Sequence, residues 1–372
     1  MKYFIVAGEA SGDLHGSNLM KAIKEKDPNA DFTFLGGDLM KKQGGNLIIH
    51  YRRMAFMGGI QILTNLKTIF QNINRCKNEI IETKPDIIVL IDYAGFNLKI
   101  ARFAKKNGFL VHFYISPKVW AWRESRVKKI KQYIDKMYVI LPFEKSFYAK
   151  HNYNVDYVGN PLLDSIKHFN DNNKEQQDGD LFGINGKYIA LLAGSRKQEV
   201  ELLLKEMLIC AEYFSKEQFI LAAAPSLPKE FYQKFRFPEN VKIVYNQTYQ
   251  VLKNAYAAIV TSGTATLETG LFEIPQVVVY KTNSLQYFVG RLVVNVKKFK
   301  YFSLVNLILQ RPAVKEILQF KVAGKTIGEL ERILYNTEHR QQILDSYKEL
   351  KSILGDHNPS SVLAEKIVDS VS

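Results

Sequence analysis

The chain has 372 residues and a net charge of +14, with 47% hydrophobic and 24% charged residues. This composition is typical of globular proteins, and the length exceeds what one ordinary core needs, so we expect two domains. Cys76 and Cys210 match no CxxC or metal-ligand spacing, and no apolar run has the length of a spanning helix. A disulfide scaffold and a transmembrane protein are therefore excluded, and a cytoplasmic protein is expected.

The positive charge is concentrated in the first half of the chain. Residues 1–170 hold 26 Lys and Arg against 15 Asp and Glu, whereas residues 171–372 hold 25 against 22. Such asymmetry favours an anionic partner, which could be nucleic acid, a phosphorylated substrate or an anionic bilayer surface. A solubilising surface charge fits the composition equally well.

Short β-rich runs alternate with helical patterns through the first half. Strands are predicted at residues 3–7, 32–35, 86–91, 110–115 and 137–141. A parallel sheet with crossover helices is the natural interpretation.

The sequence becomes polar around residues 168–187, which predicts a linker or surface loop. The alternation then restarts, with strands predicted at 188–192, 219–223, 241–244, 257–260 and 276–280. After residue 326 the pattern is helical, and we expect the last helix to pack back on the first domain. The predicted domains are 1–170, with a helix at about 345–372, and 171–344.

A glycine-containing loop, Gly8 to Asp13, follows the first predicted strand and opens a helix. Such a turn presents backbone N–H groups and the positive end of a helix to an anionic ligand. The glycine spacing does not match the dinucleotide-binding fingerprint, which disfavours a dehydrogenase. A simple tight turn is the alternative.

Two loops of the same kind follow strands of the second half. One contains Gly194, Ser195 and Arg196, and the other runs from Ser262 to Glu268. Two helix N-termini together with an arginine could hold a diphosphate, and Glu268 could accept hydrogen bonds from ribose hydroxyls. Alternatively, Ser262 and Thr264 are helix N-caps and Glu268 is an ordinary first-turn acid.

Asp92 follows the strand predicted at 86–91, where ligands bind in open α/β sheets. A general base and a helix N-cap are both reasonable roles for it.

Downstream, residues 114–131 combine aromatic and cationic side chains that could bind sugar rings, acyl chains and phosphate. No RRM, KH or helix-turn-helix pattern accompanies them, which disfavours RNA binding.

No metal or cofactor is expected. The Asp178-Gly179-Asp180 sequence imitates a metal-binding DxD motif but lies in the polar stretch, and the seven histidines form no HxH or HExxH cluster.

Residues 60–81 have the spacing of an amphipathic helix. A helix packed on its own sheet is the usual meaning of such a stripe. Because basic residues surround this one, we expect Leu63, Leu66 and Phe70 to insert into a membrane interface at the mouth of a cleft. From Ile73 onward the stripe should face the core.

Seven motifs, taken together and in order, closely resemble the lipid-A-disaccharide synthase family across nearly the whole chain. They are Gly8-Glu9-Ala10-Ser11-Gly12-Asp13, Asp92 with Phe96-Asn97, the run from Ser116 to Arg123, Leu141-Pro142-Phe143-Glu144, Gly194-Ser195-Arg196, Ser262-Gly263-Thr264-Ala265 and the run from Val314 to Gln319. Any one of these motifs alone is weak evidence for the family, whereas all seven in this order are specific to it.

The resemblance implies an α/β fold of the GT-B type, in which two doubly wound, Rossmann-like domains face a central cleft. It implies an inverting, metal-independent glycosyltransferase that joins UDP-2,3-diacylglucosamine to 2,3-diacylglucosamine 1-phosphate and releases UDP. The protein would be peripheral to the inner face of the cytoplasmic membrane, would form a homodimer, and would bind no nucleic acid.

The resemblance also implies roles for individual residues. Asp92 would be the general base, and Glu9 would support it. Residues at the acceptor lipid would be Ser11, Asn97, Ser116, Trp120, Trp122 and Arg123. Residues at the donor UDP would be Gly194, Ser195, Arg196, Ser262, Gly263, Thr264, Ala265, Thr266, Glu268, Asn306, Glu316 and Gln319.

The chain departs from the family pattern at a few positions. The usual DxPDFN motif lacks its second acid here, which favours Asp92 as the base. Ala193 and Val305 stand where proline is frequent, and Asn160 stands where histidine is common, so no proton transfer is assigned to Asn160. Other UDP-sugar enzymes, such as an epimerase or the murein-precursor transferase, remain alternatives, as does a non-catalytic nucleotide- or nucleic-acid-binding protein.

Overall fold

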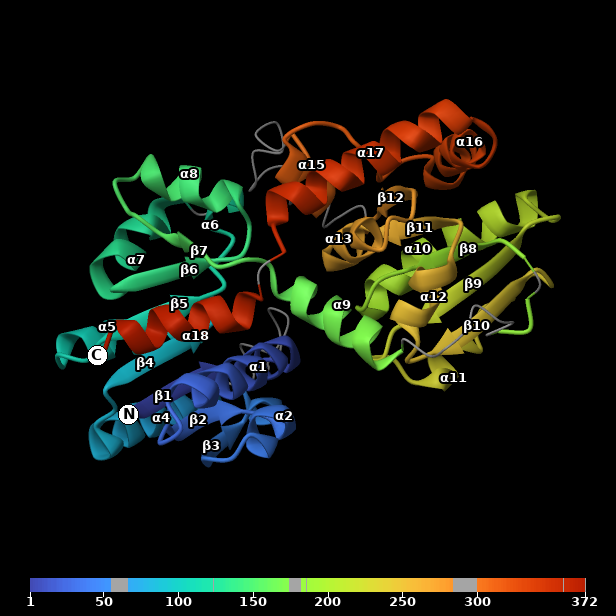
Figure 1. The fold of residues 1–372 in the computed structure, drawn as a ribbon. Coiled ribbons are helices and arrows are strands. Elements are labelled where there is room, and N and C mark those ends of the chain that lie inside the picture. Colours follow the sequence, from blue (N-terminus) through green and yellow to red (C-terminus); the bar gives the residue numbers. More distant parts are fainter. Residues whose placement is uncertain are drawn as a thin grey trace. The chain divides into compact units, whose positions relative to one another are not determined.

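The structure is a computed structural model that describes residues 1–54, 66–122, 124–173, 182–184, 186–283, 300–356 and 358–371. The chain forms two compact units (Figure 1). The first contains residues 1–165 and 356–372, and the second contains residues 166–355.

A seven-stranded parallel sheet forms the centre of the first unit, in the order β3-β2-β1-β4-β5-β6-β7. Its strands are β1 (Lys2–Ala7), β2 (Asp31–Gly36), β3 (Asn46–His50), β4 (Ile87–Ile91), β5 (Val111–Tyr114), β6 (Lys136–Val139) and β7 (Asp156–Tyr157). Its helices are α1 (Ala10–Lys26), α2 (Asp38–Lys42), α4 (Leu66–Thr83), α5 (Ala94–Lys106), α6 (Val119–Trp122), α7 (Val127–Tyr133), α8 (Phe143–Ala149) and α18 (Pro359–Asp369). Two 3₁₀ turns, Tyr51–Arg53 and Glu124–Arg126, complete it.

Both faces of this sheet are covered by helices, which is why its central strands are apolar throughout. In β4, Ile88 and Leu90 pack with α4, α5, α7 and α8, whereas Ile87, Val89 and Ile91 pack with α1 and α18. The C-terminal helix α18 lies along α1 (Figure 1).

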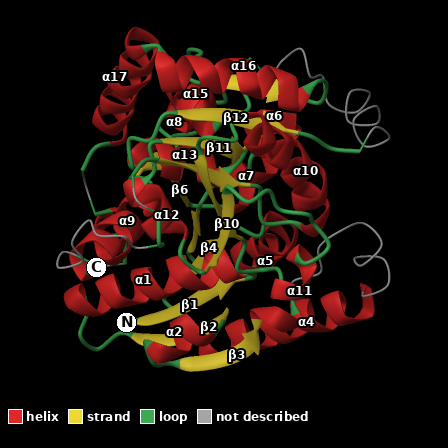
Figure 2. Cartoon of the chain, turned by 90° about the vertical axis from the view of Figure 1, so that its right-hand side faces the viewer, coloured by secondary structure: helices red, strands yellow, loops and turns green. Residues whose placement is uncertain are grey.

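The second unit has a six-stranded parallel sheet in the order β10-β9-β8-β11-β12-β13. Its strands are β8 (Tyr188–Leu192), β9 (Gln218–Ala223), β10 (Val241–Tyr245), β11 (Ala257–Thr261), β12 (Gln276–Tyr280) and β13 (Lys315–Leu318). Its helices are α10 (Lys197–Tyr213), α11 (Lys229–Tyr232), α12 (Thr248–Asn254), α13 (Thr264–Leu271), α15 (Leu304–Leu309), α16 (Val322–Tyr335) and α17 (Thr337–Leu354). The α/β class and the parallel arrangement predicted for both halves are confirmed (Figure 2).

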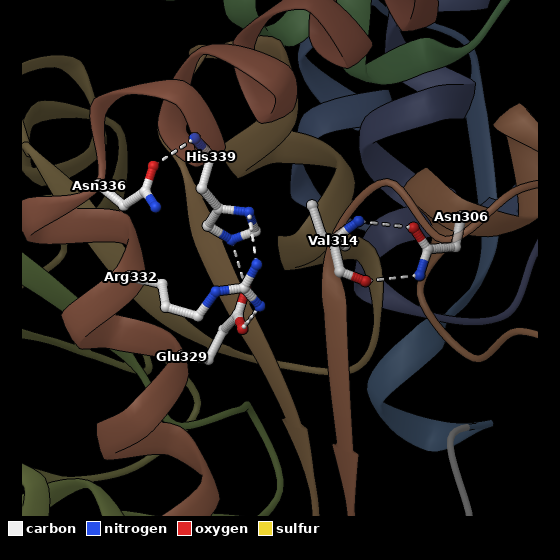
Figure 3. Close-up of polar contacts among 6 residues, drawn as sticks. All are labelled: Asn306, Val314, Glu329, Arg332, Asn336 and His339. Carbon is white, nitrogen blue, oxygen red and sulfur yellow. Dashed lines mark hydrogen bonds and ion pairs between the residues drawn. The ribbon is translucent and has the colours of Figure 1, made fainter.

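A polar cluster joins α16 to α17 (Figure 3). His339 Nε2 lies 2.7 Å from Glu329 Oε1, and Arg332 donates to the other carboxylate oxygen at 3.1 Å. The Asn336 side chain caps α17 by accepting from the His339 amide at 2.9 Å. This cluster fixes the corner between two helices.

The predicted loop at 168–187 begins too early. Helix α9 (Pro161–Asn172) continues through the first polar residues, where Asn172 Nδ2 contacts His168 Nε2 at 3.0 Å across one helical turn. Such i,i+4 pairs stabilise a helix that composition alone marks as a loop. The imitation DxD motif at 178–180 lies outside the described residues.

None of the helices in the described ranges combines the length and apolar character that crossing a membrane requires.

Candidate functional site

The strand order of the first sheet reverses between β1 and β4, and the loops that follow these two strands carry the first group of candidate residues. Ligands of open α/β sheets bind at such a switch point, outside the carboxyl ends of the strands. Glu9 is the N-cap residue of α1, Ser11 lies in the first turn of that helix, and Asp92 comes from the β4–α5 loop. Ser11 is exposed and Glu9 is half-buried.

Asp92 and Tyr93 both adopt the left-handed backbone conformation, with φ of 44° at each. This conformation is costly for residues other than glycine and persists only where the surroundings hold it, most often at functional sites. The buried Asn97 side chain holds it here, because its Nδ2 donates to the carbonyls of Asp92 at 2.8 Å and Ile91 at 3.1 Å. Asn97 therefore faces the backbone at the end of β4.

The side chain of Tyr93 ties the two loops together. Its hydroxyl donates to the Met54 carbonyl at 2.6 Å, and its ring lies where a side chain at Gly8 would otherwise extend. A Cβ at position 8 would come within 2.6 Å of Tyr93 Cε1 and closer to two other ring carbons. Gly8 is thus required for the close approach between these loops. Burial raises the pKa of Tyr93, and the charge of Glu9 raises it further.

The surroundings of the Asp92 carboxyl are suited to a general base. Burial raises its pKa, while Lys118 and the Tyr93 amide act in the opposite direction by favouring the charged form. Asp92 is not the N-cap of α5, since Tyr93 holds that position. A desolvated carboxyl at a switch point, with a nearby cation that favours its charged form, has the properties required of a general base.

Ser116 lies in the loop that follows β5 and Trp120 lies in α6, and both are near a buried acid that the sequence did not single out. The Ser116 hydroxyl is 2.6 Å from that of Tyr148 and donates to the Pro117 carbonyl at 3.0 Å. Burial raises the pKa of Glu144 to about 7, although the Leu141 amide, Ser116 and Trp120 favour its charged form. Ser116 is therefore buried within this network.

Arg123 and Leu63 lie outside the described residues, and the Trp122 side chain is not described although its backbone ends α6.

The strand order of the second sheet reverses between β8 and β11, and the loops after these strands hold the second group. Glu199, in the first turn of α10, connects them. Its Oε1 accepts from Thr261 Oγ1 at 3.2 Å, and its side chain occupies the space beside Gly194, which has φ of 109°. Both a positive φ and this close contact require glycine at position 194. Ser226 Oγ holds the same loop by donating to the Ser195 carbonyl at 2.7 Å.

Two helices begin at this switch point without a side-chain cap. Arg196 is the N-cap residue of α10 and Gly263 that of α13, and neither helix has a capping side-chain hydrogen bond. Ser262 and Thr264 are thus not N-caps: Ser262 Oγ donates to the Phe302 carbonyl at 3.0 Å, and Thr264 is the first residue of α13. Uncapped N-termini are well suited to binding phosphate. Arg196 is exposed beside them.

Thr266 and Gln319, which were also predicted at the donor, lie in the interior. Thr266 is fully buried, and its hydroxyl donates to the Gly263 carbonyl at 2.8 Å and accepts from the Leu304 amide at 3.2 Å. Ala265 lies beside it, half-buried. The buried Gln319 joins the ends of β12 and β13 through two bonds with the Thr282 backbone, at 2.8 and 3.1 Å.

Asn306 and Glu316 form one framework. Asn306 Nδ2 donates to the Val314 carbonyl at 2.9 Å while its Oδ1 accepts from the Val314 amide at 3.0 Å (Figure 3). Glu316 accepts from Asn306 Nδ2 at 2.8 Å, from both the amide and hydroxyl of Ser303, and from the Phe302 amide at 3.0 Å. These side chains fix the segment that leads into α15.

Glu268 lies one turn into α13, and its carboxylate accepts a hydrogen bond from a tyrosine of α12. Tyr249 donates its hydroxyl to Glu268 Oε1 at 2.8 Å. Burial raises the pKa of Glu268, and this hydrogen bond opposes the rise.

Helix α4 divides into an exposed and a buried part. Leu66 and Phe70 are 43% and 56% exposed, whereas Ile73, Cys76 and Ile80 are buried. Ile81 departs from the expectation that the C-terminal turns face the core, since it is 45% exposed. It follows the buried Ile80 by only 100° around the helix and falls at the edge of the stripe.

Solved structures with the same architecture span essentially the whole chain. UDP-GlcNAc 2-epimerase from Neisseria meningitidis has a TM-score of 0.68 at 13% identity, covering 99% of this chain and 100% of its own. A calicheamicin glycosyltransferase has a TM-score of 0.59 at 13% identity, covering 99% of this chain and 97% of its own. The protein therefore has the two-sheet fold of GT-B enzymes.

Residues 3–370 match the family model described as lipid-A-disaccharide synthetase, and the chain belongs to that family. The lipid-A-disaccharide synthase of Syntrophus aciditrophicus is 38% identical over 362 residues, covering 94% of this chain and 93% of its own. The lipid-A-disaccharide synthase of Coxiella burnetii is 34% identical over 368 residues, covering 98% of this chain and 96% of its own. The protein is accordingly a UDP-sugar glycosyltransferase of lipid A biosynthesis.

The sequence analysis assigned no individual role to four residues near these loops, which are Lys118, Glu144, Glu199 and Tyr249. Lys118 and Glu144 are members of motifs that were recognised, and Glu199 is a first-turn acid after a predicted phosphate loop. Tyr249 gave no signal, because only the fold brings α12 beside α13.

Proposed function

We propose that the protein transfers 2,3-diacylglucosamine from UDP to the 6-hydroxyl of 2,3-diacylglucosamine 1-phosphate, with Asp92 as the general base. The observation that carries this proposal is the desolvated Asp92 carboxyl, held by a strained backbone at the switch point of the first sheet. The products are the β-1,6-linked lipid A disaccharide 1-phosphate and UDP.

In the proposed reaction Asp92 takes the proton of the 6-hydroxyl while that oxygen attacks the anomeric carbon of the donor. The bond from this carbon to the UDP oxygen breaks, and the single displacement inverts the carbon. Lys118 supports the role of Asp92 because its charge favours the ionised form of the carboxyl that takes the proton. The exposed Ser11 and the half-buried Glu9, at the start of α1, are proposed to contact the acceptor sugar.

The donor diphosphate is proposed to bind at the switch point of the second sheet. The uncapped N-termini of α10 and α13 and the exposed Arg196 support this assignment, since they offer N–H groups and positive charge to the leaving group. Glu268 is proposed to accept from the ribose hydroxyls through the oxygen that Tyr249 leaves unused. Asn306, Glu316 and Gln319 contribute by fixing the neighbouring backbone.

The first unit is proposed to lie against an anionic membrane surface by the helical layer α4, α5, α7 and α8. These helices carry eleven Lys and Arg residues against three Asp and Glu, whereas α1, α2 and α18 on the other face carry six against five. The exposed apolar residues Leu66 and Phe70 belong to the basic layer, and Lys99 lies 5.3 Å from the Phe70 ring centre. Apolar side chains among cations are typical of interfacial binding surfaces.

The reaction is tested by incubating the protein with both lipids in anionic vesicles and analysing the products by mass spectrometry. A disaccharide 1-phosphate formed in equal amount with UDP supports the proposal. Conversion of the UDP-sugar without the acceptor would instead indicate an epimerase, and the absence of any product would overturn the assignment.

A further inference from the structure

The Glu268 carboxylate is hydrogen-bonded to a tyrosine that does not itself contact the substrates in the proposed reaction. Tyr249 extends from α12 and donates its hydroxyl to Glu268 Oε1 at 2.8 Å. Burial and the adjacent carboxylate raise the pKa of Tyr249 well above its usual range, so the hydroxyl keeps the proton that it donates to Glu268.

The Tyr249 ring is itself fixed by two others. Phe169 of α9 meets it edge-on at 5.5 Å between ring centres, and Phe272 at the end of α13 meets it at 5.4 Å. Phe169 and Phe272 also contact one another at 6.0 Å, which closes a triangle of rings. The hydroxyl therefore approaches Glu268 from a single direction.

A carboxylate that binds a ribose must present an oxygen in a fixed direction and must remain ionised. We infer that Tyr249 is a positioning residue that holds Glu268 Oε1 and directs Oε2 to the ribose hydroxyls, so that the donor site selects ribonucleoside over deoxyribonucleoside diphosphates. This inference rests on the proposed role of Glu268 in donor binding. Selectivity follows because a buried acceptor left without its hydroxyl partner is costly.

Two variants separate positioning from packing. Tyr249→Phe removes the hydroxyl and keeps the triangle of rings. Tyr188→Phe is the matched control, because the Tyr188 hydroxyl donates to the Val251 carbonyl on the same helix α12, at 2.9 Å, and does not touch Glu268.

The experiment is calorimetric titration of each protein with UDP and with 2′,3′-dideoxy-UDP. Both dissociation constants are measured on the same protein preparation. Their ratio therefore does not depend on the fraction of the protein that is folded. The unaltered protein and Tyr188→Phe should prefer UDP by about tenfold to a hundredfold. Tyr249→Phe should prefer it by less than about threefold, whatever its melting temperature.

A pH series adds a second readout. Without the Tyr249 hydroxyl the Glu268 carboxyl loses a bond that favours its ionised form, so its pKa rises. The loss of UDP affinity on acidification should then begin at a higher pH in Tyr249→Phe than in Tyr188→Phe.

The outcomes are distinct. An undiminished preference for UDP in Tyr249→Phe, with Glu268→Ala losing it, would overturn the inference and leave the donor site in place. If the unaltered protein binds UDP without any such preference, the ribose role of Glu268 itself is wrong. Failure of the unaltered protein to bind UDP would contradict the proposed function.

Discussion

Replacing Gly8 by alanine removes the space into which the Tyr93 ring packs. The new Cβ would lie within 2.6 Å of Tyr93 Cε1, and a normal contact needs roughly 1 Å more. Because the ring is held by its hydroxyl bond to the Met54 carbonyl and by stacking on Phe96, it cannot move freely.

The expected cost follows from two contributions. Overpacking of this size costs about 1–3 kcal/mol, and loss of the Tyr93 hydrogen bond adds about 1 kcal/mol. Gly8→Ala should therefore destabilise the first unit by about 2–4 kcal/mol. In a Tyr93→Ala background the same change should cost less than about 1 kcal/mol, because the obstructing ring is absent.

The assay is urea unfolding followed by tryptophan fluorescence. Trp120 and Trp122 are the two tryptophans of the chain and both belong to the first unit, so the signal reports on that unit alone. An equal cost of Gly8→Ala with and without the Tyr93 ring would refute the reasoning, as would a cost below about 0.5 kcal/mol.

Three further changes test the site and the proposed membrane surface. Lys118→Met should move the acidic limb of the kcat/KM profile to higher pH, because the cation that lowers the pKa of the proposed base is gone and activity is lost as pH falls through that pKa; an unmoved limb contradicts this. Arg196→Ala should weaken UDP binding by about tenfold to a hundredfold with an unchanged melting temperature, and unchanged affinity by calorimetry would remove it from the site. Leu66→Ser with Phe70→Ser should reduce sedimentation with anionic liposomes by about tenfold or more while barely altering the melting temperature, whereas Ile73→Ser, at a position 3% exposed, should lower it. Normal liposome binding by the double variant would mean that the membrane surface lies elsewhere.

The central strands could be predicted because burial on both faces makes them continuously apolar. Runs such as residues 188–192 and 276–280 match β8 and β12. The edge strands β3, β7 and β13 were missed, since β3 and β13 are mostly half-buried or exposed and β7 has only two residues. These three strands lack the apolar run on which the prediction depends, whereas the edge strand β10 was predicted at 241–244.

The strand-end loops were also predictable, because glycines and acids after apolar runs identify them. Where individual side chains point was not. Thr266 and Asn306 were expected at the donor, yet their polar groups bond to neighbouring backbone. The Tyr249 bond to Glu268 joins two helices that sequence periodicity treats separately.

The role of Asp92 is the central claim, and Asp92→Asn tests it most directly. The substitution keeps the size of the side chain and removes the base, so turnover of the two lipids should fall by about 10²–10⁴-fold. UDP affinity, measured by calorimetry on the same preparation, should stay within about twofold because the proposed donor residues belong to the second unit. Turnover within about threefold of the unaltered enzyme, with normal UDP binding, would contradict the assignment of Asp92 as the base.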